Sequence, residues 1–217
     1  MRSKSVLMLG MGFFGQHMAE KLIHMGHDVM AVEQDATRAN QVAEIIPNIQ
    51  IGDATDKQLI AGLGVRNFDL CVVTIGQSFQ HSLMATTLVK DAGAKFVVSR
   101  AIDSVHEQFL LRNGADAVVY PERLAGERAA IRYSMDTIFD YIQLSDDYSI
   151  VESPVPESWR GKTIQELGIR RKAQINVLAV KRGKQVTPVT DPSYQFGGDE
   201  TVIMMGSEKN LKKVLHF

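Results

Sequence analysis

The chain has 217 residues, 45% of them hydrophobic and 23% charged, which suits one large globular domain or a mid-sized domain with a smaller one. The formal net charge is -1, so the overall charge gives no reason to expect a nucleic acid as partner. Cys71 is the only cysteine, so we expect no internal disulfide and no cysteine-bound zinc. No signal-peptide pattern opens the sequence, and the apolar runs are shorter than the roughly 18 residues of a membrane span. We therefore expect a cytoplasmic protein.

Short apolar runs alternate with stretches of helical periodicity over residues 1–120. This alternation predicts βαβ units and a parallel sheet, and near-continuous apolar strands such as Val72–Val73 are typical of a sheet covered on both faces. We therefore predict an α/β fold with a Rossmann-type parallel sheet. The expected strands are Val6–Leu9, Asp28–Val32, Ile49–Ile51, Leu70–Thr74, Phe96–Ser99 and Ala117–Tyr120, and the expected helices are Gln16–Met25, Thr37–Ile46, Ser82–Ala92 and Val105–Asn113.

The pattern changes after Pro121, where two helices are expected to leave the first domain over residues 121–143. Beyond them, Pro- and Gly-containing turns separate short strands, which predicts a small α+β domain over residues 144–217. A domain of that size has a small core, so we expect docking or dimerisation. The expected helices are Glu122–Tyr133, Met135–Tyr141, Thr163–Leu167 and Ser207–Leu215, and the expected strands are Ser149–Glu152, Asn176–Lys181 and Thr201–Met205.

A glycine turn, Gly10-Met11-Gly12-Phe13-Phe14-Gly15, connects the first strand to the first helix. In this context the pattern is a dinucleotide-binding fingerprint. Gly10 permits a tight turn, Gly12 lets a pyrophosphate approach the backbone, and Gly15 lets the helix pack close to the sheet. The helix N-terminus then offers free N–H groups to the phosphates. The alternative is a glycine turn without a ligand.

Glu33 ends the second strand, about 20 residues beyond the glycine turn, where the ribose-binding acid of the fingerprint is expected. A carboxylate there accepts hydrogen bonds from both ribose hydroxyls and repels a 2′-phosphate. We therefore expect NAD(H), ATP or ADP rather than NADP. The alternative is a solvated carboxylate at a strand end.

Three more strand ends are expected to meet the ligand, because the crevice at the carboxyl ends of parallel strands binds it. Asp53 and Ala54 follow the third strand, where they can contact the base; alternatively, Asp53 or Thr55 caps the next helix. The loop Thr74–Gln77 follows the fourth strand. Arg100 follows the fifth and can meet phosphate oxygens, or it is a surface cation.

Catalytic motifs are missing from the sequence. There is no Tyr-x-x-x-Lys pair, no Gly-x-Ser-x-Gly elbow, no Walker lysine and no metal-binding cluster of His or Cys. The C-terminal region is also too short for the substrate domain of a two-domain dehydrogenase. We therefore expect a nucleotide sensor, not an enzyme. The alternative of another class is a small NAD-dependent oxidoreductase.

These residues resemble the RCK (KTN) domains of potassium channels and of Ktr/Trk-type potassium uptake systems. The likeness rests on the glycine turn with Glu33, on Gly52–Thr55, on Gly64–Asp69, and on Gly114–Asp116 followed by Pro121-Glu122. The C-terminal part resembles the RCK_C (TrkA-C) domain through segments over residues 167–170, 175–180, 198–199 and 202–206. The resemblance covers essentially the whole chain and implies the peripheral regulatory subunit of a Ktr system. The alternative that the same resemblance allows is the detached gating ring of a potassium channel.

The resemblance implies homodimers that assemble into an octameric ring on the cytosolic face of the plasma membrane, against a membrane-embedded potassium transporter subunit. Residues 121–143 would be the helical crossover through which two chains interlock.

The resemblance also implies ligands for both domains. ATP, ADP or NAD(H) would bind the first domain, with a divalent cation (Mg or Ca) held by Glu122. Cyclic di-AMP would bind the second domain at Arg170 and Asn176. The nucleotide ligands carried over by position are Gly10, Gly12, Phe13, Gly15, Glu33, Asp53, Ala54, Ile75, Gly76, Gln77, Arg100, Ala101, Ile102, His106 and Glu122.

Phe13 departs from the family pattern. Many Ktr-type relatives have an arginine at this position, and that arginine reaches a terminal phosphate. A phenylalanine cannot pair with phosphate, so the resemblance does not carry ATP-over-ADP discrimination to this chain. It leaves open a weaker response to ATP or a preference for NAD(H).

Overall fold

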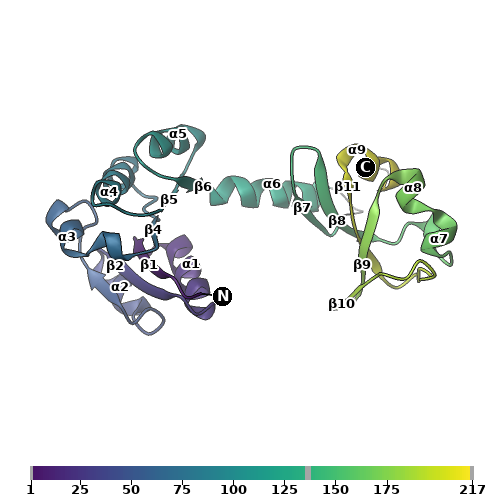
Figure 1. The fold of residues 1–217 in the computed structure, drawn as a ribbon, viewed down its shortest axis with the longest axis horizontal. Coiled ribbons are helices and arrows are strands. Elements are labelled where there is room, and N and C mark those ends of the chain that lie inside the picture. Colours follow the sequence, from purple (N-terminus) through teal and green to yellow (C-terminus); the bar gives the residue numbers. More distant parts are fainter. Residues whose placement is uncertain (1, 135–137, 216–217) are drawn as a thin grey trace. The chain divides into compact units, whose positions relative to one another are not determined.

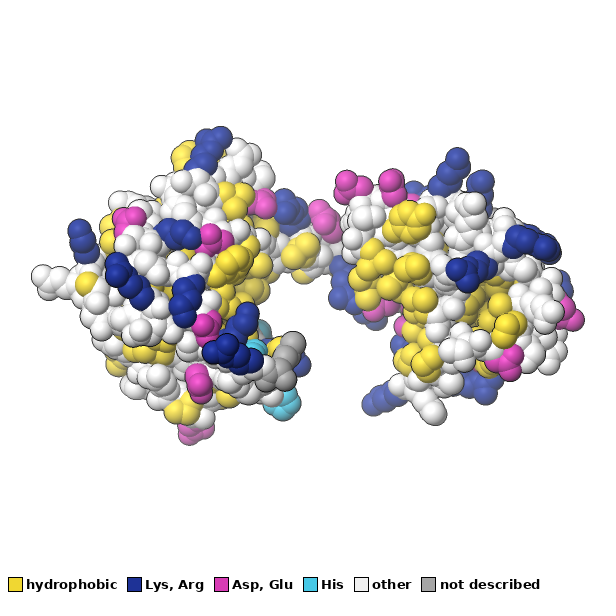
Figure 2. All heavy atoms as spheres, viewed as in Figure 1, with side chains coloured by type: hydrophobic (Ala, Val, Ile, Leu, Met, Phe, Trp, Pro, Cys, Tyr) yellow, Lys and Arg dark blue, Asp and Glu magenta, His cyan; other side chains and the backbone are white. Residues whose placement is uncertain are grey.

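The computed structural model describes residues 2–134 and 138–215. The chain forms two compact units, Met1–Arg123 and Leu124–Phe217 (Figure 1). The helix α6 (Pro121–Ser134) begins in the first unit and continues into the second. Figure 2 shows basic and acidic side chains interspersed over the visible face of each unit, in keeping with the small net charge. Within the described residues, no helix is both long enough and apolar enough to span a bilayer.

The first unit is a six-stranded parallel sheet in the order β3-β2-β1-β4-β5-β6, with helices packed along it. The strand order reverses at β1, so the chain builds one half of the sheet outward from β1 and then the other. This arrangement confirms the predicted Rossmann-type sheet. The elements are β1 (Ser5–Leu9), α1 (Phe13–His24), β2 (Asp28–Glu33), α2 (Ala36–Val42), β3 (Ile49–Ile51), α3 (Lys57–Gly62), the 3-10 turn η1 (Val65–Asn67), β4 (Leu70–Val73), α4 (Phe79–Asp91), β5 (Val97–Arg100), α5 (Ser104–Arg112) and β6 (Ala117–Val119).

The residues of the central strand β1 explain why helices pack on both faces of the sheet. Leu7 and Leu9 pack into one apolar cluster, whereas Val6 and Met8 pack into another, and all four side chains are fully buried. Side chains alternate between the two faces of a strand, so a strand that is apolar throughout must have helices on each side.

The second unit is a five-stranded antiparallel sheet in the order β10-β9-β11-β8-β7 with short helices. Burial alternates along β8 and β11, so one face of this sheet lies in the core. Trp159, Phe196 and Met204 are among the buried residues of that core. Its elements are β7 (Asp140–Gln143), β8 (Tyr148–Pro154), the 3-10 turn η2 (Glu157–Trp159), α7 (Ile164–Leu167), α8 (Ile169–Ala173), β9 (Asn176–Arg182), β10 (Gln185–Pro188), β11 (Thr201–Ser207) and α9 (Glu208–Leu215).

The predicted second helix, Met135–Tyr141, is wrong where the structure describes it. Asp140 and Tyr141 lie in β7, and Tyr141 pairs with Val151 of β8. The buried Tyr141 takes a place in the sheet core, and this tertiary pairing overrides local helical preference. Residues 135–137 lie outside the described part of the chain. The second sheet therefore includes residues from the stretch expected to be helical, 121–143, and the domain limits at 120 and 143 stay predictions.

Candidate functional site

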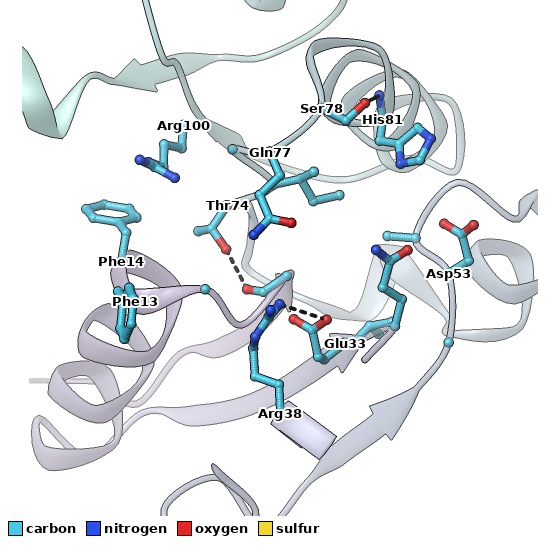
Figure 3. A pocket seen from close by; sticks show the side chains of 18 of the residues that line it. Phe13, Phe14, Glu33, Arg38, Asp53, Thr74, Gln77, Ser78, His81 and Arg100 are labelled. Carbon is cyan, nitrogen blue, oxygen red and sulfur yellow. Dashed lines mark hydrogen bonds and ion pairs between the residues drawn. The ribbon is translucent and has the colours of Figure 1, made fainter. Parts of the chain in front are cut away.

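A cavity of about 570 Å³ opens at the carboxyl ends of the parallel strands in the first unit (Figure 3). This volume lies in the range of small-molecule sites. The loops after β1, β2, β3 and β4, the end of β5 and the first turn of α6 all contribute to it, so segments distant in sequence meet here. The lining residues are Gly10, Gly12, Phe13, Phe14, Val32, Glu33, Gln34, Arg38, Gly52, Asp53, Ala54, Thr74, Ile75, Gly76, Gln77, Ser78, His81, Arg100 and Glu122.

The glycine turn has the geometry that the fingerprint requires. Gly10 has a φ of +94°, which side chains disfavour. A Cβ on Gly15 would lie 2.5 Å from the Gly10 carbonyl oxygen and 2.7 Å from Thr74 Oγ1, whereas one on Gly12 would meet no atom within 4 Å. Gly12 caps helix α1 without any side-chain hydrogen bond. The first-turn N–H groups of α1 are therefore donors toward the cavity, with the positive end of the helix dipole behind them.

Glu33 is almost fully buried, with 3% of its surface exposed. One carboxylate oxygen accepts the Met11 N–H at 2.6 Å, and the other accepts the Asp35 N–H at 2.9 Å. Arg38 Nη1 adds an ion pair at 3.3 Å. The carboxylate therefore braces the glycine turn where it lines the cavity, and these three contacts do not use all of its lone pairs.

Asp53 lines the cavity beyond the third strand and does not cap a helix. Its carboxylate accepts the N–H and the hydroxyl of Thr55, each at 2.8 Å. These hydrogen bonds, first the backbone one, hold the pKa of Asp53 below its usual value. Asp56, not Asp53 or Thr55, caps α3 by accepting from Gln58 N. The helix-cap alternative for Asp53 and Thr55 is therefore wrong, and Asp53 offers a charged acceptor to the cavity.

Arg100 enters the cavity from the end of β5. Its guanidinium lies over Gly76, pairs with Glu122 of α6, and sits 5.9 Å from the centre of the Phe14 ring. A Cβ on Gly76 would overlap the guanidinium, so a side chain there would require Arg100 to move. Thr74 donates to the Gly10 carbonyl oxygen at 2.5 Å, which joins the β4 loop to the glycine turn. Arg100 is thus a cavity residue with an ion-pair partner rather than a solvated surface cation.

The structure brings together most of the predicted nucleotide ligands, but four do not line the cavity: Gly15, Ala101, Ile102 and His106. Gly15 acts through packing, as described above. His106 is fully buried against Phe79, with ring centroids 4.7 Å apart, and burial holds its pKa below the usual value. Eight lining residues, all near the strand ends, are absent from the predicted ligand set: Phe14, Val32, Gln34, Arg38, Gly52, Thr74, Ser78 and His81.

A smaller hollow of about 170 Å³ lies in the second unit. Arg170 and Asn176, the two residues predicted for a second ligand, both line it. Apolar side chains such as Ile164, Ile175 and Pro192 form much of its remaining wall. The hollow therefore combines a guanidinium, an amide and the carboxylate of Asp191 with apolar surface.

No cluster of three or more His, Cys, Asp or Glu side chains is positioned to hold a metal ion in the described part of the chain. Glu122, the predicted cation ligand, pairs with Arg100. A cation at Glu122 would need oxygen ligands from elsewhere, such as nucleotide phosphates, because hard divalent cations take six or more oxygens.

Two family models match the chain. The TrkA-N domain covers residues 6–121, and the TrkA-C domain covers residues 150–217. Among curated relatives, the Ktr system potassium uptake protein C of Bacillus subtilis is 34% identical over 98% of both chains. The Ktr system potassium uptake protein A of the same organism is 30% identical over 98% of this chain and 96% of its own.

Among solved structures, the GsuK channel has a TM-score of 0.73 at 21% identity, and the GsuK RCK domain has a TM-score of 0.69 at 20% identity. The chain is covered at 99% and 100% but spans 40% and 48% of those chains. At this identity the likeness supports the fold alone. The two domain matches and the full-length relatives lead to one conclusion: the chain belongs to the family of Ktr/Trk potassium uptake proteins that carry a TrkA-N domain followed by a TrkA-C domain.

Proposed function

We propose that this chain is the nucleotide-binding regulatory subunit of a potassium uptake system, acting from the cytosolic face of the membrane on a membrane-embedded transporter subunit. The observation that carries the proposal is the cavity at the glycine turn, set within a chain whose full-length relatives are potassium uptake proteins. ATP, ADP or NAD(H) is the ligand. A nucleotide regulates by binding one conformation of the assembly better than another, and it shifts the population only by that difference.

The arrangement of acids supports a sensor rather than a catalyst. Glu33 already accepts two backbone N–H groups and pairs with Arg38, and Glu122 pairs with Arg100. A general base must lie within hydrogen-bond reach of the proton that it removes. Both carboxylates instead hold parts of the cavity together, which supports a nucleotide that acts as a signal.

Assembly into homodimers, and of these into an octameric ring, fits the surface of α6. None of its fourteen residues is buried, and Leu124 and Tyr133 are 59% and 80% exposed. An isolated helix with that exposure gains stability when a second chain covers it. Residues 121–143 would then interlock two chains, as the family resemblance implies.

Two further ligands belong to this proposal. A divalent cation (Mg or Ca) would bind between Glu122 and the nucleotide phosphates, once Arg100 turns from the carboxylate to the phosphates. Cyclic di-AMP would bind the second domain at a dimer interface, with Arg170 facing its phosphates and Asn176 a base edge or ribose. The smaller hollow, at about 170 Å³, would hold only part of the molecule. The apolar walls of that hollow suit the faces of purine rings.

Potassium uptake by vesicles that contain the membrane subunit of a Ktr system tests the regulatory role. We expect added chain to make uptake respond to adenine nucleotides, and the Gly12→Ala chain to need roughly tenfold or more nucleotide for the same response, because its methyl group keeps the phosphates from the backbone. Uptake that is the same with and without the chain, at saturating nucleotide, would contradict the proposal.

A further inference from the structure

The helix α9 of the second unit has a basic outer side. Leu211 and Leu215 are buried in the core of that unit, whereas Lys209, Lys212 and Lys213 are all exposed. Residues three and four positions apart lie on the same side of a helix. The two leucines therefore hold α9 against the core, and the three lysines lie together on the side that faces solvent.

The short helix α8 places three more cations beside these lysines. Arg170, Arg171 and Lys172 are consecutive, and all three are exposed. The end of α8 lies beside the first turn of α9, where Asn210 Nδ2 donates to Gln174 Oε1 at 3.4 Å. Figures 1 and 2, drawn from the same direction, show the two helices as neighbours and basic side chains over this part of the unit. We call these six lysines and arginines the basic face.

Carboxylates neutralise little of the basic face. Lys212 pairs with Glu208 at 3.8 Å, and in the described part of the chain the other members form no ion pair. Cations in the last turn of a helix are stabilised by its dipole. That effect does not explain Lys209, which lies in the first turn of α9, where the dipole disfavours a cation. The basic face is therefore a concentration of charge beyond what the two helices need.

The side chains of α8 and α9 suit an anionic lipid surface better than a protein partner. Protein interfaces are anchored by buried aromatic and apolar side chains. Neither helix exposes a large apolar side chain. Clusters of roughly four to eight Lys and Arg on a helical surface are typical of segments that bind anionic lipid headgroups. The net charge of the whole chain is -1, which disfavours a nucleic acid as the partner of this face.

We propose that the basic face docks on the anionic surface of the cytosolic leaflet, so that the second unit contacts lipid headgroups while the first unit binds the nucleotide. The inference goes beyond the proposed function and rests on it only for the place of action. Lysine and arginine side chains lie against lipid phosphates, and no side chain enters the hydrocarbon. Each charge near the surface strengthens such a contact by roughly fivefold, and salt weakens it.

Co-sedimentation of the full-length chain with lipid vesicles tests this docking. One set of vesicles contains equal parts of phosphatidylglycerol and phosphatidylcholine, and the other contains phosphatidylcholine alone. We expect binding to the anionic vesicles only, and release from them as salt is added. The triple variant Lys209→Gln/Lys212→Gln/Lys213→Gln should bind them roughly tenfold to a hundredfold more weakly.

Matched variants separate the charge of the basic face from its fold and from the charge of the whole chain. The same three lysines changed to arginine keep the charge and should bind as the wild type does. Changing three exposed lysines elsewhere, Lys21, Lys57 and Lys184, to glutamine removes an equal charge and should also leave binding unchanged. If circular dichroism shows that the α9 glutamine variant does not fold, Arg171→Gln/Lys172→Gln replaces it and should weaken binding by roughly tenfold or more.

Equal binding to both kinds of vesicle, or equal loss in the α9 variant and in the variant of the distant lysines, would overturn the proposal. Binding of the wild-type chain to RNA without binding to anionic vesicles would assign the basic face to a nucleic acid and also overturn it. Titration of the same samples with ADP distinguishes a failure of the proposed function. Nucleotide binding without vesicle binding removes the docking alone, whereas vesicle binding without nucleotide binding supports the docking and removes the nucleotide-dependent role.

Discussion

The two units of this chain use their sheets in different ways. The parallel sheet of the first unit is covered on both faces, and its strands all end at one edge, where successive loops enclose a cavity of about 570 Å³. The antiparallel sheet of the second unit has one face in a core. Its hollow of about 170 Å³ is lined by short helices, a loop and the start of β9. Parallel topology thus gathers distant loops into one site, whereas antiparallel topology mainly supplies a core.

The largest expected effect comes from the core of the second unit. Phe196 is 2% exposed and packs 5.4 Å from the Trp159 ring, so Phe196→Ala should cost about 3–5 kcal/mol of unfolding free energy. Denaturant unfolding followed by Trp159 fluorescence measures it. Phe139→Ala, at a side chain that is 47% exposed, is the control and should cost far less. If Phe196→Ala weakened nucleotide binding as strongly as it lowers stability, the two units would not be separate.

Nucleotide binding should stabilise the first unit selectively. Ligand at 100 times its Kd adds about 2.7 kcal/mol to the unfolding free energy of the unit that binds it. Trp159 is the only tryptophan and lies in the core of the second unit, so its fluorescence reports that unit. We expect NADH or ADP to raise the midpoint of the unfolding transition measured by circular dichroism. The midpoint measured by Trp159 fluorescence should stay unchanged. Equal shifts of both signals would show that the units unfold together.

Two neighbouring glycines should separate stability from binding within the first unit. Gly15→Ala places its Cβ against Gly10 O and Thr74 Oγ1 and should cost about 1–3 kcal/mol. Gly12→Ala has free space for its methyl group and should change stability by only about 0.5 kcal/mol, yet weaken nucleotide binding by roughly tenfold or more. Thermal unfolding and titration of both chains measure the contrast. Wild-type affinity in Gly12→Ala would place the phosphates elsewhere.

The smallest expected effect is a pH dependence carried by Asp116. The hydrogen bond from Lys90, and after it the Val97 N–H, hold the pKa of Asp116 below its usual value of 3.8. A lowered pKa in the folded state stabilises the fold above that usual value, and this contribution disappears as the pH falls through the folded pKa. Asp116→Asn should remove about 0.2–1 kcal/mol at pH 7 and less at pH 3. The exposed Asp91→Asn is the control; an equal loss at both pH values would contradict the ion-pair origin.

The first unit could be predicted from sequence more fully than the second. Its strands are short apolar runs between helices of regular period, and each feature is local. In the second unit, Asp140 and Tyr141 were expected to be helical and instead lie in β7, because pairing with β8 decides their conformation. Pairing with the next strand is not visible in the apolar pattern of one segment alone. Strand β10, with all four residues exposed, lacks the alternation that would have revealed it.

The residues of the site also differ in how well the sequence predicts them. The glycine turn, Glu33 and Asp53 follow from spacing, because the fingerprint ties them to strand ends. Arg38 and His81 were missed, since each lies on a helix after its loop and only the fold turns it toward the cavity. His106 was expected at the ligand through family position, but it is buried beside Phe79 and outside the cavity lining. A residue's place in the family pattern indicates which region of the fold it lies in, whereas packing determines whether its side chain lines the cavity.

Binding of an adenine nucleotide in the cavity at the glycine turn is best tested by calorimetric titration of the full-length chain with ADP, beside the Gly12→Ala chain. We expect saturable binding with one nucleotide per chain, weakened by roughly tenfold or more in the variant, whose stability stays within about 0.5 kcal/mol of wild type. Absence of saturable binding to the wild-type chain, or equal affinity in the two chains, would contradict it.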